Sequence, residues 1–275
     1  MKTWAMARFT LKETIRSRTM IAGLVLSLLY LAIVPMLSSP SSSTTMVGAM
    51  SSQAAASKAF LSFALGGLNF IAMIMAILTT LGVIYTEVES GAIYTIVTKP
   101  LHRWQIIVGK WAGHAMLMGG YVLIMGLALW LSVVVGSGSM VWSFFPAIAL
   151  ICLNVITMVS LTLMFSTFTP VIANAIFVFI VFILSSNLRI INAVSVASSS
   201  LLVDIIATGL RFLLPVSEVS SLASRLLEDD TLKTIATSTE PAVFTPRSWS
   251  FIYELAYIVI IVFVATLIFR KRDLR

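Results

Sequence analysis

Charged residues are scarce in this sequence. Only 11% of its 275 residues are Asp, Glu, Lys or Arg, whereas 59% are hydrophobic. Soluble globular domains carry about 25% charged and about 45–50% apolar residues. A chain with so few charges lacks the polar surface that a water-soluble fold of this length needs. The composition therefore excludes an ordinary soluble domain and indicates a protein that lies in a lipid bilayer.

Cysteine and histidine are nearly absent as well. Cys152 is the only cysteine, so no disulfide framework or cysteine-based metal site can form within one chain. His102 and His114 are the only histidines, and they do not form an H-E-x-x-H zinc motif. Gly109-Lys110 lacks the earlier glycine that a Walker A loop requires. We expect no catalytic site, metal or cofactor in this chain.

Six apolar runs are each long enough to cross a hydrocarbon core of about 30 Å, which takes roughly 20 helical residues. Such runs must be helices, because lipid offers no hydrogen-bond partner to the backbone. The sequence thus predicts an all-α membrane protein with six transmembrane helices, folded as a single domain over residues 1–275. The predicted spans are Met20–Leu37, Phe60–Tyr85, Gln105–Val135, Trp142–Phe168, Pro170–Leu188 and Trp249–Phe269.

Basic residues gather in three alternate segments between these runs. The N-terminal segment has Lys2, Arg8, Lys12, Arg16 and Arg18, the connection after the second run has Lys99, Arg103 and Lys110, and the tail has Arg270, Lys271, Arg272 and Arg275. The positive-inside rule places such segments in the cytoplasm. We therefore expect a multi-pass protein of the plasma (inner) membrane with both termini cytoplasmic. This reading explains the net charge of +7 without a nucleic-acid partner.

The first apolar run has an alternative reading as a cleaved signal peptide, because a basic lead precedes it and Ala/Ser-rich sequence follows. A retained span is favoured, since the run exceeds the usual 7–15 residues of a signal peptide.

Residues 1–19 predict an amphipathic helix that leads into the first span. Trp4, Ala7, Leu11 and Ile15 fall on one stripe at about 100° per residue. A basic amphipathic helix in this place should lie along the inner membrane surface. It is either a simple basic anchor or an elbow helix that also touches a cytoplasmic partner.

A long segment outside the membrane, residues 189–248, separates the fifth and sixth spans. It predicts a short apolar helix over residues 202–214 and a second one across Glu218–Leu227. At about 13 residues the first is too short to span, so it should be interfacial or re-entrant.

Strongly polar residues are few inside the predicted spans. Amide side chains in membrane helices usually bond across helices or to a partner chain, and we expect this of Asn154 and Asn174. Glu254 lies near the outer end of the last span, where a carboxylate either serves function or reaches water. These three residues are the candidates for a solute pathway. No series of buried carboxylates indicates a proton- or sodium-driven transporter, so the energy source should lie in another chain.

The connection after the second span, residues 86–104, carries the most distinctive pattern. Glu87 and Glu89 precede a short helical repeat that includes Ile93, and Pro100 ends it because a residue before proline avoids the helical region. Arg103 then opens the next helix. This connection should present a short, charged helical elbow to the cytosol.

The elbow and its surroundings resemble the type-2 ATP-binding cassette (ABC) exporter permeases. Their pattern, roughly E-x-E-x-G-T, P-x-S-R and G-K-x-x-G, is matched by Glu87-x-Glu89-Ser90-Gly91-Ala92, Pro100-Leu101-His102-Arg103 and Gly109-Lys110-Trp111-Ala112-Gly113. The sequence departs from it at Ala92, where Thr is usual, and at His102, where Ser is common. The layout of the whole chain is also similar, and the nearest subgroup is the copper-processing permeases.

The resemblance implies that residues 86–104 form a coupling helix. Its docking and shape residues would be Glu87, Glu89, Gly91, Ile93, Pro100 and Arg103, with Gly109 and Lys110 at the base of the third span. The partners would be two cytoplasmic nucleotide-binding ATPase subunits, which hold ATP and Mg²⁺, and a second permease copy or homologue. The complex would export a hydrophobic or amphipathic substrate.

Two other readings remain open. In one, the same subunit transmits ATPase-driven motion through residues 189–248 to an external accessory protein without moving a solute. In the other, the chain is a membrane scaffold that works without an ATPase.

Overall fold

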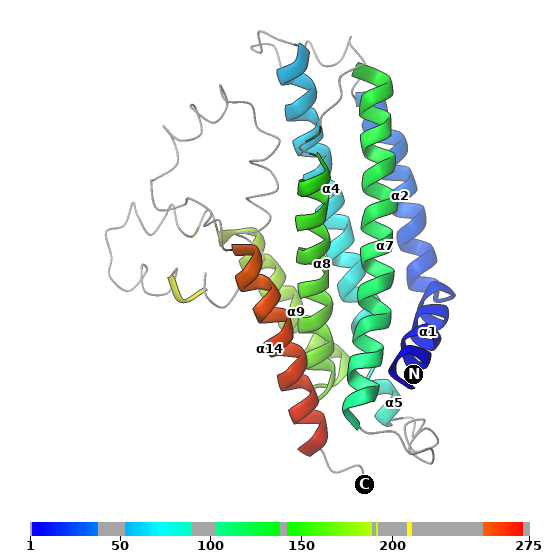
Figure 1. Cartoon of the computed structure of the whole chain (residues 1–275), viewed down its shortest axis with the longest axis vertical. Coiled ribbons are helices and arrows are strands. Elements are labelled where there is room, and N and C mark those ends of the chain that lie inside the picture. The colour runs from blue at the N-terminus through cyan, green and yellow to red at the C-terminus, as the bar shows by residue number, and fades with distance from the viewer. Residues whose placement is uncertain are drawn as a thin grey trace.

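The computed structural model describes residues 2–37, 53–89, 103–137, 142, 144–188, 191, 208–210 and 250–271. This part of the chain is helical and contains no strand, which confirms the predicted all-α class. The helices pack side by side into an elongated bundle (Figure 1). They are α1 (Lys2–Ile15), α2 (Arg18–Leu37), α4 (Gln53–Thr80), α5 (Tyr85–Glu89), α7 (Arg103–Ser137), α8 (Phe144–Ser166), α9 (Val171–Ser186) and α14 (Ser250–Lys271).

Each of the six predicted spans overlaps a helix, but the second continues past the end of α4 and the helices differ in length. Among the described residues, four helical segments are long and apolar enough to cross a membrane: Phe63–Glu89, Trp104–Ser132, Phe144–Ser166 and Phe251–Arg270. The bent pair formed by α1 and α2 counts as a fifth. Helix α9 has 16 residues and is therefore about 24 Å long, which is short of the hydrocarbon core. The count of six crossings stays a prediction.

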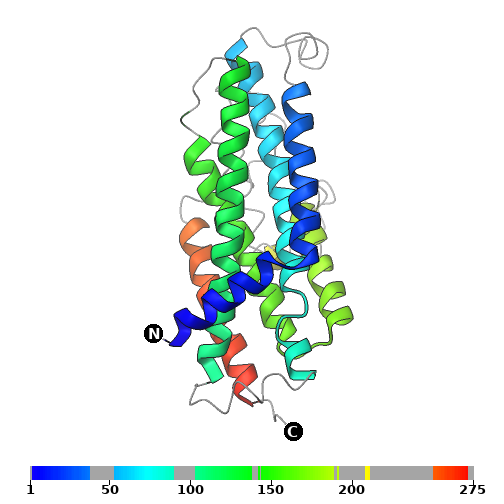
Figure 2. The same ribbon diagram turned by 90° about the vertical axis from the view of Figure 1, so that its right-hand side faces the viewer.

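Helices α1 and α2 meet at a bend of 63°. The chain leaves α1 through a turn in which the Arg16 N–H donates to the Glu13 carbonyl, and Ser17 then caps the next helix. The Ser17 hydroxyl accepts a hydrogen bond from the Met20 N–H at 3.2 Å, as an N-cap serine does. Figure 2 shows the consequence: α2 runs along the bundle whereas α1 lies across the lower part of α7.

Helix α8 lies at the centre of the bundle and packs against α4, α7, α9 and α14. Its inner residues Val155, Met158 and Val159 are fully buried in the main core cluster. The outer faces of α2, α9 and α14 instead expose many large apolar side chains, such as Leu28, Ile172 and Phe263. Apolar outer faces suit helices that face lipid, where water is absent.

The start of α1, helix α5 and the end of α14 lie at the same end of the bundle (Figure 1). We call this the α5 end. In the sequence, the three basic segments are the one that contains α1, the one that follows α5 and the one that includes the last residues of α14. The grouping agrees with the alternation of basic segments along the chain.

Candidate functional site

The chain leaves helical geometry between α4 and α5, at residues 81–84. The last carbonyls of a helix and the first N–H groups of the next lack partners in their own helix. A buried backbone group without a partner costs about 1–3 kcal/mol, and the cost rises where water is absent. Some backbone groups of this break pair with neighbouring backbone, and others bond to side chains from three other helices.

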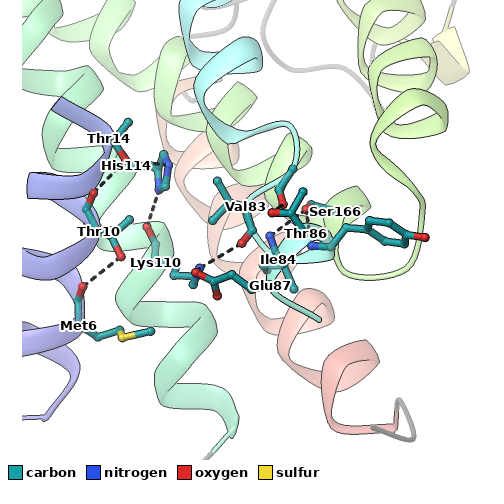
Figure 3. A network of polar contacts seen from close by, with 12 residues as sticks. Met6, Thr10, Thr14, Val83, Ile84, Thr86, Glu87, Lys110, His114 and Ser166 are labelled. Carbon is teal, nitrogen blue, oxygen red and sulfur yellow. Dashed lines mark hydrogen bonds and ion pairs between the residues drawn. The ribbon is translucent and has the colours of Figure 1, made fainter. Parts of the chain in front are cut away.

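Lys110 on α7 is the first of these side chains. Its ammonium group donates a hydrogen bond to the Val83 carbonyl at 3.0 Å and forms an ion pair with the Glu87 carboxylate on α5. The Lys110 side chain is only 3% exposed and that of Glu87 is 20% exposed. A buried lysine needs such partners, because burial penalises an unpaired charge. Figure 3 shows Lys110 reaching from α7 to Val83 in the break and to Glu87 on α5.

Ser166 and Asn174 form hydrogen bonds with other backbone groups at the break. The Ser166 hydroxyl, at the end of α8, accepts hydrogen bonds from the Ile84 and Tyr85 N–H groups at 3.2 and 3.4 Å. The Asn174 side-chain amide, on α9, donates to the carbonyls of Leu81 at 2.7 Å and Thr162 at 3.2 Å. Together with Lys110 they fix the break to α7, α8 and α9. We call Lys110, Glu87, Ser166 and Asn174 the break cluster.

The base of α7 is tied to α1 on its other side. His114 is almost fully buried, and its Nδ1 contacts the Lys110 carbonyl at 3.0 Å. Its Nε2 lies 3.4 Å from the Thr14 hydroxyl oxygen of α1, which lies 2.8 Å from the Thr10 carbonyl. Because a carbonyl only accepts, Nδ1 is the donor to Lys110, and the one Thr14 hydroxyl proton serves either Nε2 or the Thr10 carbonyl. A chain of polar contacts thus runs from α1 through α7 to α5 (Figure 3).

Two glycines allow this close approach of α1. A Cβ atom on Gly109 would lie 2.8 Å from the Met6 Cβ, and one on Gly113 would lie 2.8 Å from the Ala7 carbonyl oxygen. Residues four apart share one face of a helix, and small residues at this spacing let helix backbones pack closely in membranes. Gly109 and Gly113 therefore form a seat for α1, with Lys110 projecting toward α5.

Glu254 and Asn154 lie away from the break, on α14 and α8. Glu254 is 0% exposed, and its carboxylate accepts a hydrogen bond from the Thr157 hydroxyl at 2.8 Å. Asn154 is also fully buried, about one helical turn before Thr157. Glu254 consequently faces the interior of the bundle rather than water at its outer end.

The structure brings only part of the predicted site together. Glu89 is exposed at the last position of α5, and Arg103 is the first residue of α7. The predicted docking residues Gly91, Ile93 and Pro100 lie outside the described residues. No group of three His, Cys, Asp or Glu side chains that could hold a metal occurs in the described segments.

Sequence reasoning missed Ser166, His114 and Thr14. His114 follows Lys110 by four residues, so the two lie on the same face of α7. This spacing was the one feature of the sequence that could have placed His114 at the site. Ser166 and Thr14 carried no comparable signal, because their partners lie 82 and 100 residues away in the chain.

Comparisons with known proteins address the whole chain. None of the curated proteins compared with this sequence matches it. A family model described as ABC-2 family transporter protein matches residues 4–274, from the first turn of α1 to beyond the end of α14. The match covers the break cluster, the two glycines that seat α1, and Glu254 with its partner Thr157. The chain belongs to the ABC-2 family of transporter proteins.

Proposed function

We propose that this chain is the membrane permease subunit of an ABC transporter, and that a separate cytoplasmic ATPase drives it through α5. Membership of the ABC-2 family supports the first part, because such permeases usually work with ATP-binding subunits and typically have no catalytic site of their own. Two ATPase subunits would hold the ATP and Mg²⁺, and a second permease would complete the complex. The described helices expose many large apolar side chains, and we expect a hydrophobic or amphipathic cargo.

The break cluster is the observation that supports the proposal that the ATPase drives the permease through α5. A lever transmits motion only if it is joined firmly to the parts it must move. Helix α5 is joined to α7 through the Lys110–Glu87 ion pair and to α8 through Ser166. A push on α5 would therefore displace the base of α7, and with it α1, as one body.

The two carboxylates of α5 have different positions and so different proposed roles. Glu87 turns inward to Lys110, whereas Glu89 is exposed at the end of the helix. We assign Glu87 to the internal joint and Glu89 to contact with the ATPase. Substitution of Glu89 should then weaken binding of the ATPase without disturbing the permease fold.

Co-purification tests this assignment. The full chain is expressed with a candidate ATPase, and both the amount of bound ATPase and the rate of ATP hydrolysis are measured. Glu89→Lys should lower the bound ATPase several-fold. Glu13→Lys, which reverses an exposed acidic residue on α1 at the same end of the bundle, is the matched control and should leave binding unchanged. Retention of full binding by Glu89→Lys contradicts the assignment.

Solute uptake into inverted vesicles tests export itself. ATP-dependent uptake of an amphipathic dye by the purified complex supports an exporter. ATP hydrolysis that is coupled to the chain but moves no solute, and that depends on an added external protein, supports the transmission of motion instead.

A further inference from the structure

An open groove runs beside α1 at the α5 end. It has a volume of about 500 Å³, within the roughly 300–1,000 Å³ of small-molecule sites. Helix α1 contributes Trp4 and Ala7, α7 contributes Trp111, Ala112 and Met116, and α8 contributes Ile156. These side chains are apolar, so the groove suits a hydrocarbon occupant.

The groove follows from how α1 is seated. Gly109 and Gly113 hold one face of α1, on which Thr10 and Thr14 are buried. The neighbouring face of α7 carries Ala112 and Ala115, which are too small to fill the space toward α8. Close packing on the glycines thus leaves an uncovered strip next to them.

Two basic residues of α1 lie on the same stripe as Trp4, which lines the groove. Trp4, Arg8 and Lys12 follow one another at intervals of four and so lie along one stripe of α1. All three are exposed, and Trp4 is 64% exposed although it lines the groove. Tryptophan is enriched at membrane–water interfaces. Arginine and lysine bind phosphate oxygens strongly, arginine by two parallel hydrogen bonds.

We infer that this groove binds one anionic phospholipid, with an acyl chain along Ala112 and Met116 and the phosphate at Arg8 and Lys12. A lipid fits better than a soluble ligand because the α7 part of the groove lies within a candidate membrane span, Trp104–Ser132. An anionic headgroup fits better than a zwitterionic one because each basic residue near a membrane contributes about 1 kcal/mol toward anionic lipid. The bound lipid acts as a wedge that keeps α1 on its glycine seat.

Native mass spectrometry of the full chain tests the site. The protein is purified from micelles doped with equal parts of phosphatidylglycerol and phosphatidylcholine, and the lipid retained per chain is counted. The unaltered chain should retain phosphatidylglycerol in several-fold preference. Arg8→Gln should remove most of that preference, because its charge lies beside Trp4. Arg18→Gln is the matched control, since Arg18 is an exposed residue that begins α2 beyond the 63° bend.

Filling the groove tests the acyl-chain part. Ala112→Phe should lower retention of both lipids several-fold, whereas Ala128→Phe, farther along the same helix, should not. Should Ala112→Phe fail to fold, a phosphatidylglycerol with a photoreactive acyl chain provides the same test on the unaltered chain. It should label Trp111–Met116 more than the lipid-facing Ile124, and a phosphatidylcholine probe should not.

Three results overturn the inference. They are equal retention of the two lipids by the unaltered chain, equal loss of the preference in Arg8→Gln and Arg18→Gln, and labelling of Ile124 as strong as that of Trp111–Met116.

Discussion

Two buried charged residues of this bundle are held in different ways. Lys110 at the α5 end joins α7 to the α4–α5 break and, through the same backbone, to His114 and α1. Glu254 joins only α14 to α8 in the contact described, through the Thr157 hydroxyl. The helices that carry these two residues differ in the same sense: 44% of the α7 window is buried, against 22% of the α14 window. The first region joins several helices through polar side chains, whereas α14 packs on α8 and α7 and the contact between Glu254 and Thr157 adds to that packing.

Removing Lys110 should cause the largest loss of stability. Lys110→Met takes away the ion-pair partner of Glu87 and the donor to the Val83 carbonyl. Breaking a buried pair costs about 3–5 kcal/mol, and the 20% exposure of Glu87 places this case near 3 kcal/mol. Unfolding in detergent measures it. Lys110→Met combined with Glu87→Gln should recover part of the loss, and a double variant no more stable than the single one contradicts the pairing.

A side chain in the glycine seat should have a smaller effect. Gly113→Ala places a Cβ 2.8 Å from the Ala7 carbonyl oxygen, so α1 must shift. Overpacking of this kind costs about 1–3 kcal/mol. Gly119→Ala on the same helix is the control, because nothing lies within 4 Å of its Cβ, and alanine stabilises a helix by up to about 1 kcal/mol over glycine. Equal unfolding midpoints for the two variants contradict the seat.

Loss of the Thr157 hydroxyl should affect α14 alone. Thr157→Val removes a hydrogen bond to the Glu254 carboxylate and should cost about 1–3 kcal/mol. Thr162→Val, on the same helix, removes a hydroxyl that bonds only to its own helix at Met158 and should cost less. Hydrogen exchange of α14 should rise in the first variant and stay unchanged in the second. Faster exchange at α5 as well would contradict the separation of the two regions.

Loss of the Ser166 hydroxyl should be the smallest of these effects. Its two hydrogen bonds to the break are long, at 3.2 and 3.4 Å, so Ser166→Ala should cost about 1 kcal/mol. Hydrogen exchange at the Ile84 and Tyr85 amides measures it directly. Unchanged exchange at these amides would show that Ser166 does not hold the break.

The sequence predicts the helices of this fold well because each apolar run is a continuous stretch of the chain. The run Gln105–Val135 predicted a helix that the structure gives as Arg103–Ser137, and Trp249–Phe269 corresponds to Ser250–Lys271. The break at residues 81–84 was not predicted, and the second span was extended through it to Tyr85. The sequence of the break, Leu-Gly-Val-Ile, is apolar and looks like a continuation of the span. The side chains that bond to its backbone, Lys110 and Asn174, lie far away in the chain.

The contact face of α1 shows a second limit. The predicted apolar stripe contained Trp4, Ala7, Leu11 and Ile15, but the structure leaves Trp4 and Ile15 exposed and buries Ala7 with Thr10 and Thr14. The pattern within one helix cannot reveal that its partner offers two glycines, which favour small side chains over large ones. The G-K-x-x-G pattern on α7 did contain that information, and its glycines and lysine prove to have separate structural roles.

The central claim is that α5 and the base of α7 move together, and a distance between them tests it most directly. Spin labels at Thr86→Cys on α5 and Trp104→Cys on α7, both exposed sites, are introduced in a Cys152→Ser background, so that Glu89 stays intact for the ATPase. The distance is then measured in the complete complex with its ATPase, without nucleotide and with bound ATP. We predict a narrow, unchanged distance in both states, and a broadened one after Lys110→Met. A distance that changes on ATP binding while Lys110 is intact would contradict the account.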